Sequence, residues 1–113
     1  MKLDKEKCFH QVDLFGGEGE VLVWDLLKGQ PAGQIQSVLA CDLVPGGSVG
    51  AHRQADTDEV MIVHSGTGSA WVGEASYPLE AGTVVHLPLG HYLRLENSSQ
   101  DEPLHYYIVK TSP

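Results

Sequence analysis

The chain has 113 residues, which suits one globular domain, and 42% of them are hydrophobic, enough to bury a core. Seven basic residues against 15 acidic ones give a formal net charge of −8. This balance opposes binding to nucleic acid and to anionic membranes, and no cluster of Lys and Arg offsets it. No run approaches the roughly 18 apolar residues that span a bilayer.

The first residues predict the cellular compartment. Residues 1–7 are mostly charged and no apolar segment follows them, so they do not form a secretory signal, and a cytoplasmic location is expected. Cys8 and Cys41 are far apart in no paired spacing, and we expect both thiols to be reduced.

Turn residues and short apolar runs alternate along the chain. Thirteen glycines and six prolines separate runs rich in Val, Ile, Leu, Tyr and Trp, which is typical of an antiparallel all-β domain with little helix. Residues 1–18 are largely polar, with Gly16 and Gly17 near their end, and we expect an arm laid against the domain or a neighbouring subunit. Strands are expected at 20–27, 34–44, 50–54, 59–65, 69–73, 77–79, 83–87, 91–96 and 103–110.

Two spaced sets of residues occupy the middle of the chain. The first is Gly46, His52, Gln54, Glu59 and Gly66, with five, one, four and six residues between successive members. The second is Gly82, Pro88, Gly90 and Asn97, with Leu93 between the last two. Both sets resemble in spacing the two motifs of the cupin family, and most closely those of the small single-domain, sugar-isomerase-like cupins. The resemblance implies a cupin double-stranded β-helix, a jelly-roll barrel of two antiparallel sheets, over residues 19–113, and usually a homodimer.

The resemblance also implies a metal site. Cupins take two histidines and a glutamate from the first motif and a histidine from the second, to bind Fe, Mn, Ni, Cu or Zn. Carried over, the ligands are His52, Gln54 and Glu59. Gln54 replaces the second histidine and Leu93 the last one. Glutamine is a weak neutral donor and leucine is no ligand, so this set would hold a divalent ion poorly.

Other roles for these residues follow from strand geometry. Alternate side chains share a face, so His52 and Gln54 are expected to point together into the barrel. His52 and Glu59 could then act as a catalytic acid–base pair. Gln54, Met61, His91 and Leu93 are the candidate ligand-binding residues. His91 would lie about 6.6 Å along the strand from Leu93. It is included either as a residue at the barrel mouth or as a substitute metal ligand.

Three functions remain open at this point. The favoured one is a barrel that binds a small molecule without a tightly held metal, as a sensor, a carrier, or a metal-independent isomerase or epimerase. The second is a metal-dependent oxygenase, isomerase or lyase whose remodelled ligand set is His52, Gln54 and Glu59. The third is a structural or regulatory dimer whose barrel is filled by Leu93, Met61 and Val63.

Overall fold

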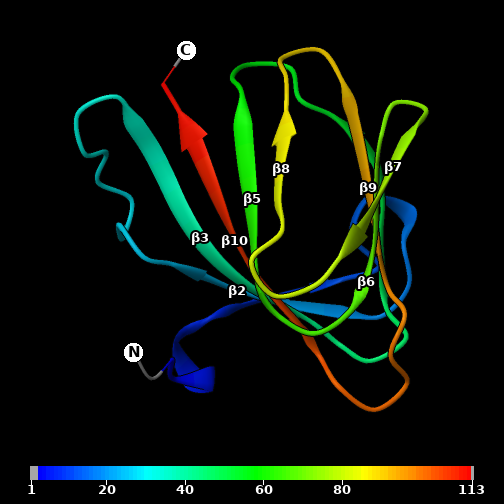
Figure 1. The fold of residues 1–113 in the computed structure, drawn as a ribbon. Coiled ribbons are helices and arrows are strands. Elements are labelled where there is room, and N and C mark those ends of the chain that lie inside the picture. The colour runs from blue at the N-terminus through cyan, green and yellow to red at the C-terminus, as the bar shows by residue number, and fades with distance from the viewer. Residues whose placement is uncertain (1–2, 113) are drawn as a thin grey trace.

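Ten β-strands in two facing antiparallel sheets dominate the computed structural model, which describes residues 3–112 (Figure 1). One sheet has the order β1-β2-β3-β10-β5-β8 and the other the order β4-β9-β6-β7. The strands are β1 (Phe9–Val12), β2 (Glu20–Asp25), β3 (Ile35–Leu43), β4 (Ser48–Arg53), β5 (Glu59–Ser65), β6 (Gly68–Val72), β7 (Ala75–Leu79), β8 (Val84–Leu87), β9 (Tyr92–Asn97) and β10 (Leu104–Thr111). The predicted all-β architecture of two antiparallel sheets is confirmed.

The N-terminal segment contains a strand that the sequence analysis did not predict. All four residues of β1 are exposed, and they pair antiparallel with β2, from Phe9 opposite Val23 to Val12 opposite Glu20. Because neither face of β1 is buried, its sequence shows no alternation of apolar and polar residues. Two 3-10 helices flank it, η1 (Lys5–Lys7) and η2 (Leu14–Gly16). Within residues 3–112, no helix has the length and apolar character required to cross a membrane.

The core lies between the two sheets because alternate side chains of each strand face inward. In β5, Glu59, Met61 and Val63 are buried, and the residues between them are more exposed. Strands of both sheets contribute to the same cluster, since Leu43 and Leu104 of one sheet pack with Leu95 of the other. The inward face of β5 therefore agrees with the one expected from its alternation.

A smaller apolar cluster covers the outer face of the six-stranded sheet. Leu22, Trp24 and Ala40 are buried there, and Leu3 and Cys8 of the N-terminal segment pack against them, together with Leu26 and Tyr107. The indole Nε1 of Trp24 donates to the carbonyl of Asp4 at 2.9 Å. The N-terminal segment is thereby attached to the outer face of β2 and β3.

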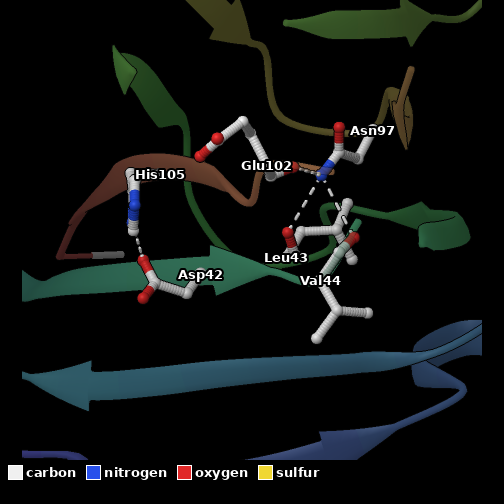
Figure 2. Close-up of polar contacts among 6 residues, drawn as sticks. All are labelled: Asp42, Leu43, Val44, Asn97, Glu102 and His105. Carbon is white, nitrogen blue, oxygen red and sulfur yellow. Dashed lines mark hydrogen bonds and ion pairs between the residues drawn. The ribbon is translucent and has the colours of Figure 1, made fainter. Parts of the chain in front are cut away.

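Asn97, the last residue of the second motif, joins three parts of the chain (Figure 2). Its buried Nδ2 donates to the carbonyls of Leu43 and Val44, each at 3.1 Å, and of Glu102 at 2.9 Å. Its Oδ1 accepts from the backbone amide of Ser99 at 2.9 Å. The side chain thus connects the end of β9 to the end of β3 and to the loop before β10.

Replacing Asn97 with Ala should lower the free energy of unfolding by about 2–4 kcal/mol, since several hydrogen bonds are lost and buried carbonyls are left unpaired. Urea unfolding followed by tryptophan fluorescence measures this loss. Ser98→Ala, at the exposed neighbouring position, is the matched control and should change stability little. A loss no larger than that of the control would show that water replaces these bonds at no cost.

Candidate functional site

A cavity of about 110 Å³ lies inside the barrel, and its walls are mostly apolar. Three of its lining side chains are His52, Glu59 and Lys110, which bring charge or polarity into it. The other lining residues are Leu14, Phe15, Val21, Val23, Leu39, Cys41, Val49, Leu93, Leu95, Tyr106 and Ile108. The cavity therefore brings together His52, Glu59 and Leu93 of the predicted site.

A β-bulge in β4 brings His52 into the cavity. Val49 pairs with Leu95 and His52 pairs with Leu93. Two residues therefore separate Val49 from His52 on β4, whereas only one separates Leu95 from Leu93 on β9. A bulge of this kind allows Val49 and His52 to line the same cavity although they are three residues apart. Leu93, with 2% of its surface exposed, lies directly across from His52. The strand position where the family pattern has a second-motif histidine is filled by a hydrocarbon side chain.

The imidazole of His52 has one ring nitrogen without a partner. Its Nδ1 is buried and accepts or donates no hydrogen bond. The ring of Phe15 stacks on it, with 4.2 Å between the centroids and an interplanar angle of 16°. Burial lowers the pKa of His52 from its ordinary value of 6.5, and this shift is partly opposed by hydrogen bonding with the backbone of Gly50 and, more weakly, by the Glu59 carboxylate. At neutral pH, His52 is therefore an uncharged imidazole with a nitrogen available to a ligand.

Glu59 forms an ion pair with Lys110. The two residues are cross-strand partners on β5 and β10, and 3.3 Å separates Oε1 of Glu59 from Nζ of Lys110. The glutamate side chain is only 5% exposed. A buried carboxylate needs such a partner because the loss of hydration is otherwise uncompensated. Lys110 was missed by the sequence analysis, since no local pattern indicates which residue of a distant strand faces Glu59.

Two predicted ligand-binding residues lie apart from the cavity. Gln54 follows the end of β4, and its Nε2 donates to Oγ1 of Thr57 at 3.0 Å. Its backbone amide donates to the carbonyl of His91, also at 3.0 Å. His91 precedes β9 and is exposed, with Nδ1 at 3.4 Å from the carbonyl oxygen of Leu89. Gln54 and His91 therefore do not line the cavity with His52, although strand alternation predicted that Gln54 would point into the barrel beside it.

The residues present do not fit a metal ion. Nowhere in residues 3–112 do three His, Cys, Asp or Glu side chains gather closely enough to hold one. Of the three predicted ligands, Gln54 binds Thr57 and Glu59 binds Lys110. The ammonium group beside Glu59 would also repel a divalent cation. Met61, the remaining predicted residue, is buried in the core.

Comparison with known proteins extends this description. A family model described as "Cupin domain" matches residues 40–110. A predicted oxalate decarboxylase from Thermotoga maritima has a TM-score of 0.85 and 22% identity, with 100% of both chains covered. A cupin 2 conserved barrel domain protein from Salinispora arenicola CNS-205 has a TM-score of 0.75 and 22% identity, covering 99% of this chain and 87% of its own. The search of curated protein sequences gave no match.

The lowered pKa of His52 predicts how stability depends on pH. The unfolded chain binds the proton first, so the stabilising effect of the neutral ring is complete above pH 6.5 and is lost as the pH falls below that value toward the folded pKa. His52→Leu should therefore lose less stability than the wild type between about pH 7 and pH 5. Urea unfolding at several pH values measures this, with His91→Gln as the exposed control. Parallel curves for wild type and His52→Leu would contradict the assignment.

The Glu59–Lys110 pair predicts a coupled pair of mutations. Lys110→Met leaves the buried carboxylate without its partner and should lower the free energy of unfolding by about 1–3 kcal/mol. Glu59→Leu combined with Lys110→Met should restore most of this loss, because no unpaired charge remains. Thermal and urea unfolding of both single variants and of the double variant complete the cycle. Strictly additive effects would show that the two groups do not interact.

Proposed function

Since the chain belongs to the cupin family and a lysine occupies the charged part of its barrel site, we propose that it binds a small molecule there without a tightly held metal. The observation that carries this proposal is the ion pair between Glu59 and Lys110. The ammonium group compensates the buried carboxylate, which is a role that a bound cation otherwise has. The apolar walls suit a ligand with a largely hydrocarbon body.

The unpartnered nitrogen of His52 supports a polar contact with this ligand. A hydroxyl or amide donor on the ligand would satisfy Nδ1, which is otherwise a buried acceptor without a partner. The neighbouring Lys110 ammonium would favour an electron-rich oxygen on the same molecule. A carbonyl compound with an adjacent hydroxyl has both features.

The same arrangement supports a metal-independent isomerase or epimerase. In such a reaction, a C–H bond of the substrate breaks, its proton moves to Nδ1 of His52, and the electron pair stays on the substrate as an enolate. The Lys110 ammonium would stabilise the enolate oxygen. In an isomerisation, the hydroxyl proton of the substrate passes to the enolate oxygen and Nδ1 returns its proton to the neighbouring carbon. In an epimerisation, the enolate turns over in the site before Nδ1 returns the proton to the opposite face of the same carbon. Either route regenerates the neutral imidazole.

The helix η2 supports a route of entry for the ligand. Phe15 has a left-handed backbone with φ of 54° and is 55% exposed although it stacks on His52. The backbone of η2 lies so close to β4 that a Cβ on Gly50 would come within 1.9 Å of the carbonyl oxygen of Phe15. Because a non-glycine residue in this conformation is strained, displacement of Phe15 would release strain as it uncovers His52.

Metal content and thermal stability test the proposal together. Untagged wild type, purified without added metal or chelator, should contain far less than one transition metal per chain by elemental analysis. A screen of small hydroxycarbonyl compounds should find ligands that raise Tm to the same extent with and without chelator. One equivalent of metal in the wild type, with a loss of Tm in chelator, would overturn the proposal.

Two variants serve as controls for metal content. Leu93→His restores the missing imidazole opposite His52, and adding Lys110→Gln removes the competing cation. We expect metal to rise in the order wild type, Leu93→His, Leu93→His with Lys110→Gln. Equal metal in all three would show that Leu93 and Lys110 do not control binding.

A further inference from the structure

A second pocket, of about 330 Å³, lies on the outer face of the six-stranded sheet. The N-terminal segment provides one wall, with Leu3 and with Lys5 of η1. The rest of the lining comes from four strands, through Trp24, Ala40, Cys41, Asp42, His64, Ser65, His105, Tyr106 and Tyr107. Cys41 and Tyr106 also line the barrel cavity, because β3 and β10 separate the two spaces.

A histidine–carboxylate dyad lines this pocket. Asp42 on β3 and His105 on β10 are cross-strand partners, and Nδ1 of His105 bonds to Oδ1 of Asp42 (Figure 2). The Asp42 side chain is 17% exposed and that of His105 is 38% exposed. When the imidazole is neutral, a carboxylate at Nδ1 keeps the proton on that nitrogen and leaves the free lone pair on Nε2. The dyad therefore offers an oriented proton acceptor.

A β-bulge brings two more polar side chains to the dyad. On the other side of β10, His105 pairs with Ser65 while Tyr106 pairs with Val63, which leaves His64 as the additional residue. Both His64 and Ser65 line the pocket. Bulges of this kind re-aim side chains, and here the bulge adds an imidazole and a hydroxyl beside His105.

Aromatic side chains and one cation complete the lining. Trp24 is held by the hydrogen bond from its indole to Asp4, which also holds the segment that carries Lys5. Tyr107 meets His64 edge to face, with 6.1 Å between the ring centroids. The pocket thus combines flat apolar surfaces with an ammonium group and a proton acceptor.

We propose that this outer pocket is a second ligand site, which binds a small aromatic hydroxy acid. The hydroxyl of the ligand donates to Nε2 of His105, its ring packs against Trp24 and Tyr107, and its carboxylate faces the ammonium of Lys5. Lys5 brings a positive charge to a pocket that also holds Asp42, and a ligand carboxylate needs such a charge in a chain of net charge −8. The site does not depend on the function proposed for the barrel.

Titration with 4-hydroxybenzoate, followed by ¹H–¹⁵N NMR of the full chain, tests the proposal. The indole N–H of Trp24 and the amides of Ser65 and His105 should shift and saturate at millimolar ligand. His105→Gln should raise Kd about tenfold, the effect of one lost hydrogen bond. Lys5→Gln, a surface change that leaves the sheet intact, should also weaken binding, and benzoate should bind less tightly than 4-hydroxybenzoate.

His86→Gln is the matched control. His86 lies 3.6 Å from Asp58 in another histidine–carboxylate pair that is outside the pocket, so this variant should bind as the wild type does. Absence of saturable shifts, or equal Kd for wild type, His105→Gln and Lys5→Gln, would overturn the proposal. Shifts confined to the amides of Val49 and His52 would also overturn it, because they would place the ligand in the barrel.

Discussion

The position of β10 between β3 and β5 is the constraint on which both sites of this protein depend. On its inner face, the strand carries Lys110 to the buried Glu59 of β5. On its outer face, it carries His105 to Asp42 of β3. A strand with neighbours on both sides presents each of its residues to two partners, and successive residues to opposite faces. One strand thus supplies a charged group to the barrel and an imidazole to the outer pocket.

The electrostatics of the barrel explain why this member of the family differs from its pattern. A carboxylate in an apolar cavity is costly unless a positive charge lies beside it, and either a metal or an ammonium group provides that charge. With Lys110 in place, a second cation beside Glu59 would be repelled. Leu93 fills the position opposite His52 and extends the apolar wall. The hydrocarbon side chain of Leu93 and the ammonium group of Lys110 are therefore consistent with each other.

Backbone packing positions the cover of the barrel. The helix η2 reaches β4 closely because Gly50 has no side chain, and Phe15 then lies over His52. Burial of the ring lowers the pKa of His52, and Phe15 contributes to that burial by stacking on the imidazole.

The sequence by itself determined nine of the ten strands, the inward direction of Glu59, and the place of the turn and end residues such as Asn97. These features depend on local alternation and on spacing along the chain, and both can be read without knowing the neighbours of a strand. The structural relatives and the matching family model confirm the fold that this spacing indicated.

Only the tertiary structure decided which residues meet across strands. It paired Lys110 with Glu59 and His105 with Asp42, and it turned Gln54 toward Thr57. It also added β1, whose exposed faces leave no periodic signal. The physical reason is that side-chain direction is a property of one strand, whereas cross-strand neighbours depend on sheet order, register and bulges, which involve the whole chain.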